Sequence, residues 1–189
     1  MERVLLISSS SKGLDMLVQL IRSAGSYEIS ALSNGSEARR IINQKEFELI
    51  IINSPLTDEF GHELSIDIAE KTNSGVVLLC KSEISDDVSD KVGAYGVCVV
   101  SKPLNKTLFY QAIRLVSATR SRMLGLKKEN FKLQSKIEEI RLINRAKCTL
   151  IQYLKLTEPQ AHRYIEKQAM DLRQTKLEVA QRILTTYGL

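Results

Sequence analysis

Polar residues directly follow four of the short apolar runs in the first hundred residues, and these positions are the first candidates for chemistry. Ser8 and Ser9 follow the first run, and Asn53 follows the letters LIII. Cys80 follows VVLL, and Lys102 stands before a proline after the last run. Functional side chains of parallel α/β sheets gather beyond the carboxyl ends of the strands. We therefore expect these five side chains to share one pocket.

This predicted pocket holds one cation and no carboxylate. Mg²⁺ prefers anionic oxygen ligands, and phosphoryl transfer to a protein needs a nucleophile beside a charge-neutralising metal. Asp58, five residues after Asn53, is the nearest carboxylate, but we expect it in a loop. Lys102 must then be satisfied by Ser8, Asn53 and backbone carbonyls, or reach solvent. We predict no metal, no cofactor and no enzymatic activity.

The elements that must position these residues alternate between strand-like runs and helical spacing. This alternation is typical of repeated βαβ units, whose parallel sheet is buried on both faces. We therefore expect an α/β domain with a five-stranded parallel sheet. The predicted strands cover residues 4–7, 27–32, 49–52, 76–79 and 97–100.

Composition narrows the class of protein. The 189 residues are 43% apolar, and no apolar run approaches the roughly 18 residues of a membrane span. The beginning of the sequence lacks a signal stretch, so we expect a cytoplasmic protein. Cys80, Cys98 and Cys148 are far apart and odd in number, which predicts neither a disulfide framework nor a zinc site. We interpret all three cysteines as buried, small apolar residues.

Charge is divided unevenly along the chain. Residues 1–117 carry 12 basic and 15 acidic side chains, whereas residues 118–189 carry 15 basic and 7 acidic ones. A basic rear half favours a polyanionic partner, although solvated helix faces have the same composition.

Beyond residue 107 the pattern stays helical for about 50 residues, a length that favours a coiled coil. Leucine or isoleucine at position d and an asparagine at a central a position are typical of a parallel two-stranded coil. We predict a homodimer through this segment, although so short a repeat also fits a helix packed on its own domain. Position a holds Met123, Asn130, Ile137 and Asn144, and position d holds Leu126, Leu133 and Ile140.

Two capping boxes divide the rest of the chain. Thr157 with Gln160, and Thr175 with Glu178, predict helices over residues 158–172 and 176–185, after a long helix that ends near residue 153. These three helices are expected to form a small bundle. Its predicted core positions are Ile143, Ala146, Leu150, Leu154, Ala161, Tyr164, Ile165, Ala169, Leu172, Leu177, Ala180, Ile183 and Leu184.

The first 118 residues resemble the receiver domain of two-component response regulators. Gly61 falls eight residues after Asn53, as the family's glycine does after its phosphorylated aspartate, and Lys102-Pro103 matches the family's lysine and proline. The resemblance implies a flavodoxin-like fold in which Ser8, Ser9 and Asn53 replace the family's acidic residues. We interpret residues 1–118 as a phosphorylation-incompetent pseudo-receiver that binds a regulatory protein.

The last 50 residues resemble the ANTAR domain of bacterial transcription antitermination regulators. The residues that carry this resemblance are Ala146-Lys147 with Leu150, Thr157-Glu158, Ala161, Ala169-Met170 and Val179-Ala180. Cys148 stands where the family has glycine and is expected to permit close helix packing. The resemblance implies binding to tandem stem-loops in nascent leader RNA, which prevents a terminator hairpin. We expect a stalk at residues 119–135 and an ANTAR domain at 136–189.

Basic side chains supply phosphate contacts in such an interface, and polar or aromatic ones contact unpaired bases. The expected phosphate contacts are Lys147, Lys155, Arg163, Lys167, Arg173, Lys176 and Arg182, and the expected base contacts are Thr157, Gln160, His162 and Tyr164. Tyr164 also fits the bundle core, and His162 a plain surface position. Two alternatives remain: a helix-turn-helix regulator that binds DNA, and a protein adaptor that uses only the coil.

Overall fold

The computed structural model describes residues 2–187. The predicted domains at 1–118 and 136–189 include residues 1, 188 and 189, which lie outside the described residues. The chain divides into two compact units, the first through Gly125 and the second from Leu126 onward. The predicted divisions after residues 118 and 135 stay predictions. Helix α5, Lys106–Leu154, contributes its first part to one unit and its last part to the other.

The first unit contains the predicted five-stranded parallel sheet, in the order β2-β1-β3-β4-β5. Long runs of Val, Ile and Leu form its central strands, which are buried on both faces. The first four strands include the predicted runs, and three of them extend the run by one to three residues, whereas β5 begins one residue later than predicted and ends two residues later. The strands are β1 Glu2–Ser8, β2 Tyr27–Leu32, β3 Leu49–Asn53, β4 Gly75–Lys81 and β5 Cys98–Lys102.

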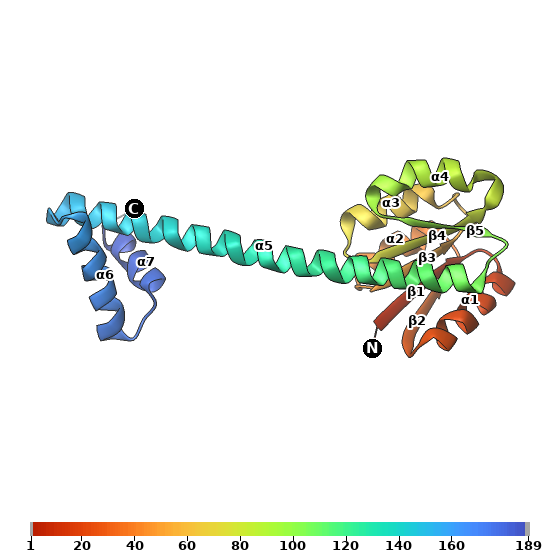
Figure 1. The fold of residues 1–189 in the computed structure, drawn as a ribbon, viewed down its shortest axis with the longest axis horizontal. Helices are drawn as coiled ribbons and strands as arrows, with labels where there is room; N and C mark the ends of the chain where they lie inside the picture. The colour runs from red at the N-terminus through yellow and green to blue at the C-terminus, as the bar shows by residue number, and fades with distance from the viewer. Residues whose placement is uncertain (1, 188–189) are drawn as a thin grey trace. The chain divides into compact units, whose positions relative to one another are not determined.

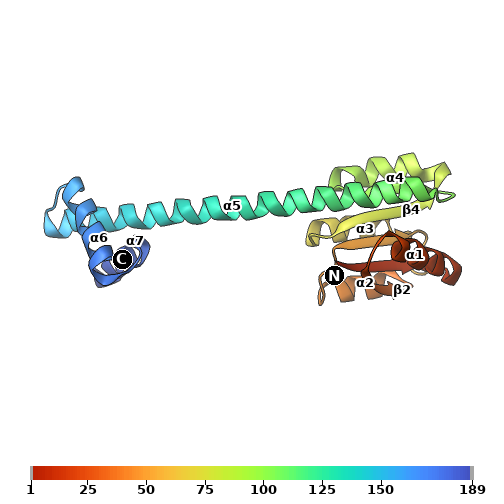
Figure 2. The ribbon, with the colours of Figure 1, turned by 60° about the horizontal axis from the view of Figure 1, so that its bottom comes forward.

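Helices cover both faces of this sheet (Figure 1). One face packs against apolar residues of α1 and of the first part of α5, with Phe109 fully buried. The other face packs against α2, α3 and α4 (Figure 2). These helices are α1 Ser11–Ala24, α2 Gly35–Ile42, α3 His62–Lys71 and α4 Ser85–Val92, with short 3₁₀ helices at Ser82–Ile84 and Gly93–Tyr95. This arrangement is the predicted flavodoxin-like α/β fold.

The second unit packs the end of α5 against α6, Glu158–Leu172, and α7, Lys176–Thr186. Its core is small and built from alanine and branched aliphatic residues, which allows close approach of the three helices. The buried residues of this core are Ala146, Leu150, Ala161, Ile165, Ala169, Val179, Ala180, Ile183 and Leu184. The predicted long helix and three-helix bundle are therefore confirmed.

Two basic residues end the helices of this bundle in the left-handed backbone region. Lys155 follows α5 with φ 56°, and Arg173 follows α6 with φ 52°. The Arg173 N–H donates to the carbonyls of Ala169 and Met170, which closes the last turn of α6. Glycine or asparagine usually occupies such positions because other side chains cost about 1–2 kcal/mol there. Lys155 and Arg173 thus each stand directly after the end of a helix, in a backbone conformation unusual for a lysine or an arginine.

Five expectations about packing are wrong. Leu154, Tyr164 and Leu172 were expected in the bundle core, but 40–46% of each side chain is exposed. Cys148 was expected to be buried against a neighbouring helix, but it is exposed, and Cys98 is only partly buried. Ala146, Thr149 and Leu150 occupy the buried face of α5, so residue 148 falls on the opposite side of the helix.

None of the helices in the described part of the chain is long and apolar enough to span a membrane. Within residues 2–187, no group of three or more His, Cys, Asp or Glu side chains is placed to hold a metal ion.

Candidate strand-end pocket and nucleic-acid interface

The end of β1 and the end of β3 form a small, neutral hydrogen-bond network. Ser8 and Asn53 are register partners across the two strands. The Asn53 Nδ2 atom donates to Ser8 Oγ at 2.9 Å, and Ser8 Oγ donates to the Ser10 carbonyl at 3.0 Å. Ser8 and Asn53 are both buried. Ser9 is exposed and donates to the Pro55 carbonyl at 2.7 Å. The neutral side chains of this edge thus satisfy one another.

Lys102 is held by the backbone of the same edge. Its Nζ donates to the Ser54 carbonyl at 2.5 Å, as expected for a backbone partner, whereas no bond to Ser8 or Asn53 is present among the described residues. Burial lowers the pKa of Lys102, because the charged ammonium loses water. Cys80 is fully buried, and this burial raises the pKa of its thiol. The five predicted pocket residues thus lie at or next to the carboxyl ends of four adjacent strands, β1, β3, β4 and β5.

This donor set does not fit a magnesium ion. Ser8, Ser9 and Asn53 offer neutral hydroxyl and amide oxygens where Mg²⁺ requires carboxylates. The Ser8 hydroxyl is already bound to Asn53 and to the backbone of Ser10. Ser54 Oγ is buried without a hydrogen-bond partner among the described residues, but it too is uncharged.

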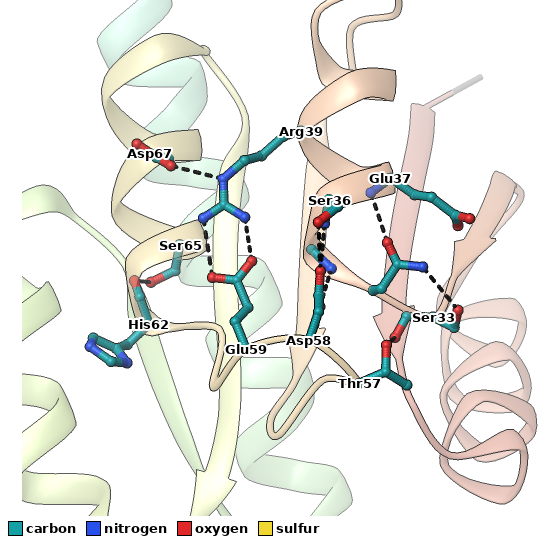
Figure 3. Close-up of polar contacts among 12 residues, drawn as sticks. Ser33, Ser36, Glu37, Arg39, Thr57, Asp58, Glu59, His62, Ser65 and Asp67 are labelled. Atoms are coloured by element: carbon teal, nitrogen blue, oxygen red, sulfur yellow. Dashed lines mark hydrogen bonds and ion pairs between the residues drawn. The ribbon is translucent and has the colours of Figure 1, made fainter.

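The nearest carboxylates belong to the loop after β3, and they bind helix α2 instead (Figure 3). Asp58 accepts bonds from the backbone N–H groups of Gly35 at 2.8 Å and Ser36 at 2.9 Å, and from Ser36 Oγ at 2.8 Å. These donors lower the pKa of Asp58 to about 2. The carboxylate therefore caps the positive end of α2, as carboxylates do at helix N-termini.

Arg39 of helix α2 binds both Glu59 of the same loop and Asp67 of helix α3 (Figure 3). Both nitrogens of the Arg39 fork bond to the carboxylate of Glu59, and its Nε donates to Asp67 at 3.0 Å. The Arg39 guanidinium and Lys71 hold the pKa of Asp67 below its usual range. Gly61, which begins α3 with φ 101°, completes this turn. Sequence patterns gave no sign of these contacts, since they join residues 20 or more positions apart.

Basic side chains of residues 146–187, in the second unit, fall into two groups. The first group is paired: Lys147 Nζ lies 2.8 Å from Glu158, and Lys176 Nζ lies 2.6 Å from Glu166. These lysines lower the pKa of the two glutamates. Only 17% of the Lys147 side chain is exposed. Both carboxylate partners were missed because α5 and α7 reach α6 only through the tertiary fold.

The second group is exposed and has no carboxylate partner within residues 2–187. It consists of Lys155, Arg163, Lys167, Arg173 and Arg182, the last of which bonds to Gln174 at 3.2 Å. Tyr164 lies beside Arg163 on α6 and is 40% exposed, which suits contact with a base better than a core position. Exposed cations are suited to phosphate contacts, and an exposed aromatic ring is suited to base contacts.

Thr157 and Gln160 are occupied by the start of α6. The Thr157 N–H donates to Gln160 Oε1 at 2.9 Å, which completes the predicted capping box. His162, on the same helix, lies 3.2 Å from Glu166. These polar side chains therefore shape the helix end in the free protein, and their contact with bases stays a prediction.

The predicted coil residues lie on the surface of α5. Met123, Leu126, Leu133, Ile137 and Ile140 are each 51–58% exposed, and Asn130 is exposed between them. An apolar row of this kind normally packs against a partner surface, and without one it stays in contact with water. Dimerisation through it stays a prediction.

Comparison with known proteins agrees with this division of the chain. Residues 132–184 match the family model of the ANTAR domain. The transcriptional regulatory protein PdtaR of Mycobacterium tuberculosis is 27% identical over 172 residues, which cover 91% of this chain and 84% of PdtaR.

Solved structures resemble the first part of the chain. The receiver domain of an HD domain-containing protein from Pseudomonas fluorescens has a TM-score of 0.58 at 20% identity and covers 66% of this chain and 92% of its own. The response regulator TrrA from Thermotoga maritima, solved with Mg²⁺ and BeF, has a TM-score of 0.54 at 22% identity and covers 61% of this chain and 99% of its own. Such identities establish the fold alone. In this chain a segment that matches the ANTAR domain, residues 132–184, follows a domain of the receiver fold, and the two together are similar to a transcriptional regulatory protein.

Proposed function

We propose that this protein is an RNA-binding transcription antiterminator that holds stem-loops of nascent leader RNA through its ANTAR domain. The observation that carries the proposal is the ANTAR match on a unit that exposes Tyr164 and five cations without a carboxylate partner within residues 2–187. Backbone phosphates supply most of the affinity in such a complex, and unpaired bases stack on aromatic rings. The protein acts by binding and performs no catalysis.

The receiver-like domain, in this proposal, does not run a phosphorylation cycle. Asn53 stands where the family has its phosphorylated aspartate, and an amide nitrogen replaces one of the two carboxylate oxygens. The neutral pocket supports this view, because neither metal binding nor a carboxylate nucleophile is available at Ser8, Ser9 and Asn53. The domain regulates the protein by binding another protein.

Two copies of the chain, joined along the apolar row of α5, present two ANTAR domains to one transcript. A second hairpin on the same RNA then binds at a high effective concentration rather than as an independent, weak event. This supports the preference for tandem stem-loops that the proposal includes. Size-exclusion chromatography with light scattering of the wild type and of Ile137→Asp should give a dimer and a monomer, respectively.

Selection from labelled transcripts with two stem-loops and randomised loops tests the RNA part of the proposal. We expect enrichment of a defined loop sequence, and binding of the selected RNA that weakens steeply with salt. Duplex DNA of the same sequence should compete poorly. Failure to enrich any RNA, or stronger binding to duplex DNA, would overturn the proposal in favour of a DNA-binding regulator.

Intact mass after incubation with acetyl phosphate and Mg²⁺ tests the regulatory part. We expect no phosphoryl adduct on this chain, while a receiver that retains its aspartate, incubated in parallel, gains one. The mass is measured at neutral pH, because an acyl phosphate that hydrolysed in acid would leave a protein with the mass of the untreated sample. A phosphoryl group on any aspartate of the first unit would contradict the proposal.

A further inference from the structure

Helix α5 carries a basic surface that lies outside the proposed hairpin site. Residues 119–145 include eight lysines or arginines and three acidic residues, whereas residues 146–189 include seven and four. The stretch ahead of the bundle is therefore more basic than the bundle itself. Such a density of positive charge in an exposed helix favours a polyanion.

Three of these lysines form a single row. Lys128, Lys132 and Lys136 are spaced four residues apart, so each lies about 6 Å further along the helix on nearly the same side. All three are exposed, and within residues 2–187 none forms an ion pair or hydrogen bond. Further along this stretch, Glu138 forms an ion pair with Arg141 at 3.6 Å.

An aromatic ring stands beside this row. Phe131 lies three residues after Lys128, one helical turn away, and 71% of its side chain is exposed. In the heptad pattern Lys128, Phe131 and Lys132 take positions f, b and c, which face away from the seam of a two-stranded coil. Dimerisation therefore leaves the ring in water, which is an unfavourable place for a phenylalanine without another partner.

The cations of the row are not suited to stabilising the coil. Lys136 takes position g, which in a parallel dimer lies opposite position e of the next heptad on the other helix. Arg141 occupies that position, so the two side chains repel each other. Coil flanks that select a partner helix normally pair opposite charges. A polyanion would relieve this repulsion.

We propose that Lys128, Phe131, Lys132 and Lys136, together the α5 outer surface, bind single-stranded RNA that adjoins the hairpins held by the ANTAR domain. The proposal rests on the proposed function and extends it to the transcript beside the stem-loops. The lysines contact successive phosphates, and Phe131 stacks on an unpaired base. Positive grooves with an aromatic platform bind single strands in this way, without sequence preference.

Fluorescence anisotropy with a labelled oligouridylate, which forms no hairpin, tests the α5 outer surface in the full chain. We expect the wild type to bind at low salt and Phe131→Ala to weaken binding about tenfold. The triple variant K128Q/K132Q/K136Q should lower the slope of log affinity against log salt by about 2, at about 0.7 for each lost contact to a single strand. Crosslinking of 4-thiouridine should label the peptide that contains Phe131.

A matched control removes three exposed lysines of the first unit, in the variant K12Q/K45Q/K91Q, and should leave binding and slope unchanged. Equal binding by the two triple variants, or no binding of oligouridylate by the wild type, would overturn the inference. Binding of the same variants to phosphatidylserine vesicles is measured in parallel. If K128Q/K132Q/K136Q lost only vesicle binding and kept oligouridylate binding, the surface would be a membrane contact, and the inference would be overturned. These outcomes are independent of hairpin selection, because oligouridylate carries no stem-loop.

Discussion

Lysine is partly buried in the strand-end pocket of the first unit but exposed on the basic surface of residues 146–187 in the second unit. Lys102 is partly buried and satisfied by the Ser54 carbonyl, and burial lowers its pKa. Lys155 and Lys167 remain in water without a carboxylate partner within residues 2–187. A buried ammonium must be satisfied locally because desolvation is costly, whereas an exposed ammonium stays available to an incoming phosphate. The first region is therefore closed to anions, and the second is open to them.

The second unit contains the same contrast within itself. Lys147 and Lys176 are held by Glu158 and Glu166, while Arg163 and Lys167 have no carboxylate partner among the described residues. An RNA phosphate must displace a glutamate from the first pair but only water from the second. The eleven residues predicted to contact RNA are thus expected to contribute unequally to binding.

The largest expected effect follows from this inequality. The variant R163Q/K167Q should weaken binding of the selected hairpin RNA about thirtyfold at moderate salt, because it removes two charge-assisted phosphate contacts. The variant K147Q/K176Q removes the same charge but should weaken binding only about threefold. Filter binding across a salt series measures both. Equal losses for the two variants would mean that the ion pairs open on binding, and the division into two groups would fail.

A second prediction restores charge to the closed region. The variant S8D/S9D/N53D places three carboxylates at one sheet edge, where they repel one another unless a cation joins them. We expect this variant to melt below the wild type without Mg²⁺ and to regain several degrees when Mg²⁺ is added. The melting temperature of the wild type should not depend on Mg²⁺. Differential scanning calorimetry measures these shifts.

The uncharged variant S8N/S9N controls for side-chain size in this experiment, since asparagine nearly matches aspartate in shape. Its stability should not respond to Mg²⁺. The single variant Asn53→Asp covers the case in which the triple variant fails to fold. A rise in the melting temperature of the wild type with Mg²⁺ would show that the neutral pocket binds the ion after all.

A third prediction concerns a basic residue whose backbone is unfavourable. Lys155 has φ 56°, where glycine is free of the side-chain clash. Lys155→Gly should therefore stabilise the second unit by about 1 kcal/mol and, by removing a cation, weaken RNA binding about fivefold. Hydrogen exchange of the amides of α6 and α7 measures the first effect. Lys155→Ala keeps the strained backbone, so it should weaken RNA binding equally without stabilising the unit.

The sequence predicted the scaffold better than the contacts on it. Strand-end positions such as Asn53, and caps such as Thr157 with Gln160, were predictable because local spacing alone determines them. Tyr164 and Cys148 were misplaced because a small three-helix bundle buries a narrower stripe than a two-sided sheet. The pairing of Lys147 with Glu158 depends on how α5 meets α6, which no periodicity reports.

The smallest expected effect concerns Asp58, the carboxylate in the loop after β3 that caps helix α2. Asp58 is exposed, but three converging donors from Gly35 and Ser36 lower its pKa to about 2 from an ordinary value of 3.8. Because the pKa is depressed in the folded state, the carboxylate stabilises the fold above about pH 4, and this contribution disappears as the pH falls through about 2. Asp58→Asn removes one acceptor oxygen, so it should speed hydrogen exchange of the Ser36 amide at neutral pH. The difference between variant and wild type should shrink as the pH falls through about 2, because the Asp58 carboxylate becomes protonated and neutral there. Asp90→Asn, at an exposed position of α4, should leave that amide unaffected at every pH. A pH-independent difference for Asp58→Asn would mean that side-chain shape rather than charge holds the loop to α2, and the strand-end region would then owe nothing to the carboxylate beside it.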